Sequence, residues 1–189
     1  TPAAAREALA AAGLACEPTF FSPDGLAVAA GAGALGETAP FREGGLHIQD
    51  EASQLVAPLV DPRPGETLLD LCAGSGGKTT HLAALLQNSG EILAVDIHPR
   101  KLADLETLAR HLGATPIRTW ARNAEADLGE AFHARFDRVL VDAPCSGTGT
   151  LRRNPEIKWR LQPRDLGTLV RRQRRILDAA AAYPRRGGL

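Results

Sequence analysis

One short stretch of the chain, Asp142-Ala143-Pro144-Cys145-Ser146-Gly147-Thr148-Gly149, places an acid and a cysteine close together in a turn. It follows a strand-like run, Phe136 to Val141, so Asp142 and Cys145 should emerge at the carboxyl end of that strand. Open α/β sheets bind their ligands at that edge. Such a pair suits chemistry on cytosine, where a thiolate adds to carbon 6, carbon 5 becomes nucleophilic, and an acid holds the N3 and amino edge. The alternative is a buried, inert cysteine at a turn.

A second stretch, Asp70 to Thr80, reads Asp-Leu-Cys-Ala-Gly-Ser-Gly-Gly-Lys-Thr-Thr and joins a predicted strand to a predicted helix. Its glycines allow a ligand to approach the backbone, and the helix N-terminus offers free N–H groups. A Walker A loop requires glycine where Cys72 stands, and the dinucleotide motif requires glycine where Thr79 stands. The stretch therefore favours a nucleoside pocket over a phosphate-binding loop.

Asp96 ends the next predicted strand, 20 residues after Gly76, where a carboxylate can accept hydrogen bonds from both ribose hydroxyls. Its alternative role is to cap the helix that begins near Pro99. Asn123, after the third predicted strand, is a candidate for the adenine edge, although an ordinary loop asparagine fits the pattern nearly as well. S-adenosylmethionine would supply both the adenosine and the methyl group that the cysteine chemistry needs, whereas NAD would leave Cys145 without a role.

Alternating strands and helices must position these residues, and from Glu66 onward the sequence shows that alternation. It predicts a parallel sheet with helices on both faces. The expected strands are Thr67–Cys72, Glu91–Asp96, Thr115–Thr119 and Phe136–Asp142, and the expected helices are Lys78–Gln87, Pro99–Leu112 and one that begins at Pro163. In the last helix an apolar face at helical spacing should pack inward, formed by Leu166, Leu169, Val170, Gln173, Ile176, Leu177 and Ala180. Its arginines 171, 172, 174 and 175 are expected to be solvated, in preference to contacting RNA.

Residues 1–43 predict a small α+β module ahead of this sheet. A helix to about Gly13 should be followed by strands at Cys16–Phe21 and Gly25–Ala29 and by a glycine- and alanine-rich loop over Gly31–Pro40. Asp50 is the expected N-cap of the helix that leads into the main domain.

Composition and charge limit the classes of protein to consider. The chain has 189 residues, 44% hydrophobic and 23% charged, which is ordinary for a globular protein. Its cysteines, at positions 16, 72 and 145, lie too far apart for a zinc motif or a disulfide scaffold and suit a reducing cytoplasm. No apolar run approaches membrane-spanning length. Residues 1–150 hold 11 basic and 19 acidic residues, while 151–189 hold 11 basic and three acidic, which hints at a nucleic-acid-facing end.

Three stretches of the sequence together resemble the NOL/NOP/Sun family of RNA cytosine-5 methyltransferases. The resemblance is strongest to the bacterial branch of the family that acts on small-subunit ribosomal RNA. The three stretches are Leu-Cys-Ala-Gly-Ser-Gly-Gly-Lys-Thr, Asp-Ala-Pro-Cys-Ser-Gly-Thr-Gly and Arg-Arg-Asn-Pro-Glu-Ile-Lys-Trp. The resemblance implies a Rossmann-like class I methyltransferase domain over residues 44–189, with part of an RNA-recognition module over 1–43. It implies S-adenosylmethionine as the cofactor, RNA as the partner, and neither a metal nor a membrane. We expect a monomer.

The resemblance also implies roles for single residues. The cofactor and base pocket is formed by Cys72, Ala73, Gly74, Ser75, Gly76, Gly77, Lys78, Asp96, Asn123 and Asp142, although the family more often has aspartate where Asn123 stands. Cys145 and Asp142 are the catalytic candidates. For RNA we expect contacts from Arg152, Arg153, Lys158 and Arg160, with Trp159 as a hydrophobic anchor for their loop in preference to a stacking residue.

One departure concerns the nucleophile. In this family the attacking thiolate comes from a second cysteine, in a Thr-Cys pair beyond the next strand, and the Pro-Cys cysteine assists later in releasing the methylated RNA. No cysteine follows Cys145 here, and there is no methionine, so we expect a fragment or a processed form. On that expectation the sheet is incomplete at its C-terminal side and the chain alone is inactive. The alternative is a non-catalytic module that binds S-adenosylmethionine or RNA.

Overall fold

The computed structural model describes residues 1–28 and 32–189, and a parallel sheet forms its centre. The strands stand in the order β5-β4-β3-β6 and all neighbours are parallel. Their bounds are β3 (Thr67–Leu71), β4 (Glu91–Asp96), β5 (Ile117–Ala121) and β6 (Arg138–Val141). The chain moves outward from β3 to β5 and then returns to the other side of β3 as β6. This reversal creates a crevice between the carboxyl ends of β3 and β6.

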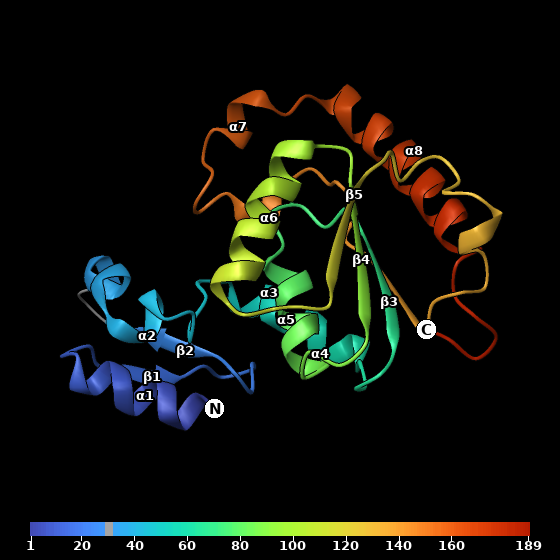
Figure 1. Cartoon of the computed structure of the whole chain (residues 1–189). Helices are drawn as coiled ribbons and strands as arrows, with labels where there is room; N and C mark the ends of the chain where they lie inside the picture. The colour runs from blue at the N-terminus through green and yellow to red at the C-terminus, as the bar shows by residue number, and fades with distance from the viewer. Residues whose placement is uncertain (29–31) are drawn as a thin grey trace.

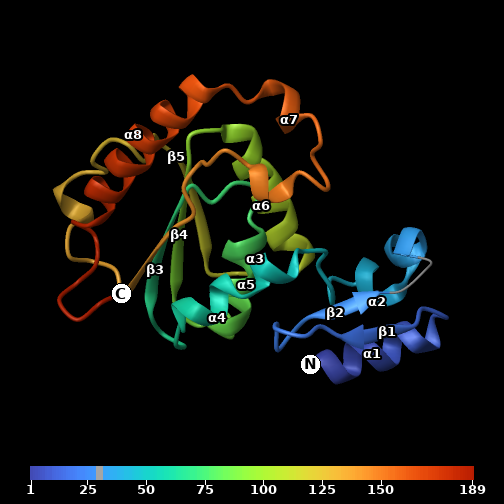
Figure 2. The same ribbon diagram turned by 180° about the vertical axis from the view of Figure 1, so that it is seen from behind.

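Helices cover both faces of the sheet, as Figures 1 and 2 show from opposite sides. On one face Leu68 packs with Leu82 and Leu86, and on the other Leu69 packs with Ile176. This separation follows from the alternation of side chains along a strand. The first face carries α3 (Glu51–Gln54), α4 (Val56–Val60), α5 (Gly77–Leu85) and α6 (Pro99–His111), and the second carries α8 (Pro163–Ala180). The predicted Rossmann-like fold is confirmed.

A small α+β unit precedes the sheet and has its own apolar core. It contains the two predicted strands, which are shorter than predicted and pair antiparallel. Leu9, Leu14, Cys16 and Leu35 are buried together in it. The elements are α1 (Pro2–Ala11), β1 (Cys16–Pro18), β2 (Leu26–Val28), the 3₁₀ helix η1 (Ala32–Glu37) and α2 (Ala39–Arg42). Figure 1 shows the unit beside the lower end of the main domain.

The predicted loop over Gly31–Pro40 is wrong where the structure describes it. That segment forms η1 and the start of α2, because Leu35 packs into the small core and the Thr38 hydroxyl donates to the Leu35 carbonyl oxygen at 2.7 Å. Ala29 and Gly31, which bounded two of the predicted segments, lie outside the described residues.

The third strand of the sheet lies two residues later than predicted. β5 begins at Ile117 because Ile117 pairs with Ile92 of β4, whereas the Thr115 backbone N–H is turned to the Asn88 side chain at 3.2 Å. The last helix also differs in part from its prediction. Ile176 and Ala180 are buried, but the side chain of Leu177 is 62% exposed, and Leu166 and Val170 are about half exposed.

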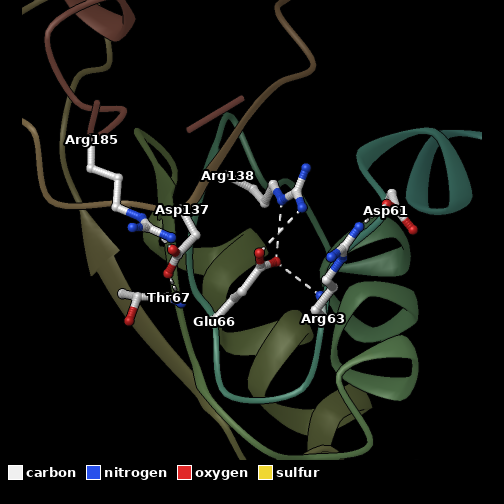
Figure 3. Close-up of polar contacts among 7 residues, drawn as sticks. All are labelled: Asp61, Arg63, Glu66, Thr67, Asp137, Arg138 and Arg185. Carbon is white, nitrogen blue, oxygen red and sulfur yellow. Dashed lines mark hydrogen bonds and ion pairs between the residues drawn. The ribbon is translucent and has the colours of Figure 1, made fainter. Parts of the chain in front are cut away.

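An ionic cluster fixes the amino ends of β3 and β6, opposite the crevice (Figure 3). Arg138 donates to both carboxylate oxygens of Glu66, at 3.1 and 3.2 Å, and Asp137 accepts from the Thr67 backbone N–H at 2.7 Å. Arg185, after α8, pairs with Asp137 at 2.5 Å. Beyond it, Leu189 exchanges two backbone hydrogen bonds with the outer edge of β6. Within 1–28 and 32–189, no helix combines the length and apolar character needed to cross a membrane.

Candidate functional site

A cavity of about 510 Å³ opens at the carboxyl ends of β3 and β6. The glycine-rich turn after β3 and the turn after β6 both line it. Every residue predicted to bind the cofactor or to act in catalysis lies on its wall, namely Cys72, Ala73, Gly74, Ser75, Gly76, Gly77, Lys78, Asp96, Asn123, Asp142 and Cys145. Sites that lie 73 residues apart in sequence, from Cys72 to Cys145, are thereby brought into one space.

The glycine-rich turn bends back onto the sheet through residues with left-handed backbone. Gly76, the N-cap of α5, has a φ of 90°, and a Cβ on it would lie 2.4 Å from Cγ of Leu105. Glycine is therefore required at this position. Because Gly76 offers no side-chain cap, the amides of the first turn of α5 remain available to a ligand in the cavity.

Asp96 lies at the end of β4 with its side chain almost fully buried. One carboxylate oxygen accepts from the Gly74 backbone N–H at 3.0 Å and the other from the His98 N–H at 2.8 Å. Asp96 thus both orders the glycine-rich turn and supports the start of α6. Each carboxylate oxygen has further acceptor capacity, so the same side chain can also serve a ligand hydroxyl.

Lys78 and Asp142 form an ion pair inside the cavity. The Lys78 Nζ donates to Asp142 Oδ2 at 2.6 Å, and the lysine side chain is 22% exposed against 52% for the aspartate. Lys78 comes from the first turn of α5 and Asp142 follows β6, so the pair spans the crevice. It fixes the orientation of a carboxylate that lines the cavity.

Asp70, which the sequence prediction did not include among the site residues, lines the floor of the cavity. Its carboxyl is buried, accepts from the Thr79 hydroxyl at 2.6 Å, and has its pKa raised to about 7. The main cause is burial, and Asp142 and Asp96 raise the pKa further, while the Thr79 hydrogen bond and Lys78 lower it. The position of Asp70 at the end of a strand, next to the glycine-rich turn, could have indicated that it belongs to the site.

The two cavity cysteines differ in environment. Cys72 is partly buried, with a φ of 65°, and burial together with the nearby Asp96 and Asp70 raises the pKa of its thiol to about 11. Cys145 is exposed. Because a thiolate is the reactive form, the raised pKa of Cys72 lowers its reactive fraction at neutral pH.

Helix α8 supports the turn that carries Cys145. Gln173 Nε2 donates to the carbonyl oxygen of Pro144 at 2.8 Å. The expectation that Arg172 is solvated is wrong, since this half-buried side chain lines the cavity and its Nε lies 2.8 Å from a carboxylate oxygen of Glu125. Arg175 contacts the same carboxylate. The position of Arg172 directly beside Gln173, on the inward edge of the helix, was the signal for this placement.

The four residues predicted to bind RNA lie outside the cavity wall, on the segment that follows the Cys145 turn. This segment contains the 3₁₀ helix η3 (Thr148–Thr150) and the short helix α7 (Ile157–Arg160). Arg152, Lys158 and Arg160 are exposed, whereas Arg153 pairs with Asp50. Asp50 does stand at the N-cap position of α3, but its side chain makes no capping hydrogen bond.

Other wall residues were also missed from the sequence. They are Gln49, Ser53, Ile97, His98, Lys101, Ala124, Ala143, Pro144 and Ile176. Ile97 and His98 directly follow Asp96, and Ala124 directly follows Asn123, so position next to a strand-end polar residue could have indicated them. Gln49 and Ser53 reach the cavity through the packing of α3 against α5, which has no local signal. Within the described part of the chain, no group of His, Cys, Asp or Glu side chains is arranged to hold a metal ion.

Comparison with known proteins yields one family and a set of relatives. The model of the family described as 16S rRNA methyltransferase RsmB/F matches residues 57–189. The chain is 39% identical over 166 residues to a probable ribosomal RNA small subunit methyltransferase B from Synechocystis, which covers 88% of the chain and 37% of the relative. The chain spans about a third of the length of the curated relatives it matches.

Solved structures resemble the chain over most of its length. A methyltransferase homolog from Pyrococcus horikoshii is 26% identical, with a TM-score of 0.86, and the match covers 100% of this chain and 58% of that one. The crystal structure of NSun6 from the same organism, with the S-adenosylmethionine analogue SFG, is 30% identical with a TM-score of 0.72. That match covers 81% of this chain and 38% of that one.

Proposed function

Because the chain belongs to the 16S rRNA methyltransferase RsmB/F family, we propose that it forms the cofactor- and base-binding part of an enzyme that methylates carbon 5 of a cytosine in small-subunit ribosomal RNA. The methyl donor is S-adenosylmethionine. The observation that carries the proposal is the single cavity in which the glycine-rich turn, Asp96, the Lys78–Asp142 pair and Cys145 come together.

The donors and acceptors of the cavity fit this cofactor. Amides at the start of α5 suit its carboxylate, Asp96 suits the ribose hydroxyls, and Asn123 suits the adenine edge. Ile97, 43% exposed at the cavity, offers an apolar surface beside Asp96. When bound, S-adenosylmethionine supplies an electrophilic methyl group. The solved NSun6 structure with a cofactor analogue supports this assignment.

The Lys78–Asp142 pair is proposed to hold the target base. The Asp142 carboxylate, fixed by Lys78, accepts a hydrogen bond from the exocyclic amino group of cytosine and so defines the N3 edge. This contact discriminates against uracil, which has a carbonyl oxygen in place of that amino group. In this proposal Asp142 contacts both the cofactor and the target base.

The covalent step requires a thiolate at carbon 6, and we propose that it comes from a cysteine that is not among these 189 residues. Its addition forms a sulfur–carbon bond and makes carbon 5 nucleophilic, so that carbon 5 takes the methyl group as the methyl–sulfonium bond breaks and S-adenosylhomocysteine leaves. Carbon 5 then gives its proton to a base, the ring double bond returns, and the sulfur leaves carbon 6 as the thiolate. The resemblance to RNA cytosine-5 methyltransferases implies that Cys145 assists this release. The raised pKa of the Cys72 thiol, about 11, makes Cys72 a poorer candidate for thiolate chemistry.

Replacing Cys145 in the full-length protein tests this division of roles. With Cys145→Ala, methylated RNA should stay attached to the protein, so a denaturing gel with radiolabelled RNA should show a slow band that the wild type lacks. Cys16→Ala, at a buried position in the small N-terminal core, is the matched control and should behave as wild type. Loss of every adduct in Cys145→Ala would make Cys145 the nucleophile.

A non-catalytic binding module is the alternative, and it predicts neither adduct nor methylation in any variant.

Residues 1–43, the separate α+β unit, are proposed to take part in RNA recognition. Four basic residues are proposed to lie along the RNA near the target base, namely Arg152, Arg153, Lys158 and Arg160. The Arg153–Asp50 pair leaves Arg152, Lys158 and Arg160 as the stronger candidates for phosphate contacts.

A further inference from the structure

The indole of Trp159 lies exposed on α7, the short helix that follows the Cys145 turn. It is 78% exposed, so the expectation that it anchors its loop through burial is wrong. Single exposed apolar side chains are common on protein surfaces, so the case for a partner depends on what surrounds the ring. The surroundings of Trp159 indicate what that partner is.

Helix α7 is fixed against the turn that carries Cys145. Gly147 has a φ of 71°, and a Cβ added to it would lie 2.9 Å from Cδ1 of Ile157. Ile157 therefore packs directly on this turn. Residues two apart on a helix point to different sides, so Trp159 faces away from the contact that Ile157 makes. Figures 1 and 2 both show α7 at the end of the molecule where the carboxyl ends of the strands lie.

The charge around the indole is positive. The Lys158 ammonium lies 5.4 Å from the Trp159 ring centroid, and Arg152 and Arg160 are exposed on the same segment. Within 1–28 and 32–189, no acidic side chain lies within ion-pair distance of Lys158 or Arg160. The Arg153–Asp50 pair ties the segment back to the start of α3. An aromatic face among unpaired cations matches a single-stranded nucleic acid, whose bases stack while its phosphates attract the cations.

We propose that Trp159 is a stacking platform for an unpaired RNA base next to the target cytosine. The inference rests on the proposed function, which places the target base in the neighbouring cavity. Stacking on Trp159 would hold the strand on α7 while the target base enters the cavity, and it would tolerate different bases because every base has a stacking face.

The chain has only two tryptophans, so its fluorescence can report on this residue alone. Trp120 is partly buried against Phe132, with ring centroids 5.2 Å apart, and Trp120→Phe leaves Trp159 as the only source of tryptophan fluorescence. The probe is a short uridine-rich RNA strand that contains one cytosine. Its addition should quench Trp159 emission, with a midpoint equal to the affinity measured by anisotropy of the labelled RNA.

Affinity measurements separate stacking from charge. Trp159→Ala should weaken RNA binding about tenfold without changing its salt dependence, and Trp159→Phe should retain most of the affinity. Lys158→Ala should weaken binding and reduce the salt dependence. Leu177→Ala, which removes another exposed apolar side chain near the far end of α8, is the control and should change neither quantity.

Two outcomes would overturn the inference and leave the proposed function intact. In the first, RNA binding is unchanged in Trp159→Ala and the RNA does not quench Trp159 emission. In the second, the chain self-associates and Trp159→Ala abolishes that self-association. If no variant and no wild-type chain binds the RNA, the proposed RNA partner fails together with the platform.

Discussion

Single residues decide the chemistry of the cavity, and its three carboxyl groups illustrate how. Asp70 is buried with one hydroxyl partner, Asp96 accepts from two backbone N–H groups, and Asp142 is paired with Lys78. The same side chain is thereby adapted to three different tasks, because burial, backbone donors and a neighbouring charge act on a carboxyl in different ways.

Removing the Asp96 carboxylate should weaken cofactor binding. Asp96→Ala leaves the ribose hydroxyls and the Gly74 N–H without their acceptor, which should cost about 1–3 kcal/mol of binding free energy. Titration calorimetry with S-adenosylhomocysteine measures this loss, and Asp104→Ala, an exposed acid on α6, is the control. Equal affinity in wild type and Asp96→Ala would contradict the ribose assignment.

Asp70 should make the stability of the fold depend on pH. Its carboxyl would ionise near pH 3.8 in the unfolded chain but keeps its proton to about pH 7 in the fold. Between these values the folded state binds more protons than the unfolded state, so the free energy of unfolding falls as pH rises and levels off above about pH 7.

Asp70→Asn should remove this dependence while keeping an acceptor for Thr79. Relative to wild type, the variant should therefore gain roughly 3 kcal/mol of unfolding free energy between pH 5 and pH 8, since the wild type loses about 1.4 kcal/mol per pH unit up to about pH 7. Urea unfolding at the two pH values provides the measurement. Parallel pH profiles for the two proteins would show that Asp70 is ionised in the fold.

At the scale of elements, stability and chemistry occupy opposite edges of the sheet. The carboxyl ends of β3 and β6 carry the cavity, and their amino ends carry the ionic cluster of Figure 3. In that cluster Glu66 accepts from the Arg63 N–H and from the Arg138 guanidinium, with little of either paired side chain exposed.

Glu66→Ala should lower the free energy of unfolding by about 2–3 kcal/mol, because it leaves the Arg138 guanidinium partly buried without its partner. Cofactor affinity should not change, since the site lies at the other edge. Chemical denaturation and calorimetry test the two statements separately, and Glu91→Ala, an exposed acid at the start of β4, is the control. A loss of affinity equal to that in Asp96→Ala would show that the two edges are coupled.

The elements show what the sequence could predict and what it could not. The strand Glu91–Asp96 was predicted to the residue, because its buried run is bounded by Gly90 and by the polar segment before Pro99. The cavity-wall residues that belong to the glycine-rich turn and to the turn with Asp142 and Cys145 were also predictable, because each turn is a sequence motif. The exposure of Trp159 was not, because the outward position of its side chain depends on how α7 packs against the Cys145 turn. The helix η1 was missed because its burial comes from the tertiary core around Leu35.

For the whole molecule, the proposed division of roles predicts binding without turnover. The 189-residue chain should bind S-adenosylhomocysteine, since every residue predicted to bind the cofactor lines the cavity, but should transfer no methyl group to RNA. Radiolabelled methyl transfer to small-subunit ribosomal RNA lacking the modification is the assay, and the full-length protein is the positive control. Multiple turnovers by the chain alone would assign the nucleophile to one of its own cysteines.

The three cysteines lie at three depths, buried at position 16, partly buried at 72 and exposed at 145. At neutral pH an alkylating reagent should therefore modify Cys145 first, since Cys72, with a thiol pKa of about 11, is scarcely ionised. Because Cys145 lies on the cavity wall, its alkylation rate becomes a direct reporter of occupancy. Mass spectrometry of that one thiol can then rank candidate ligands in unpurified mixtures, without an engineered label.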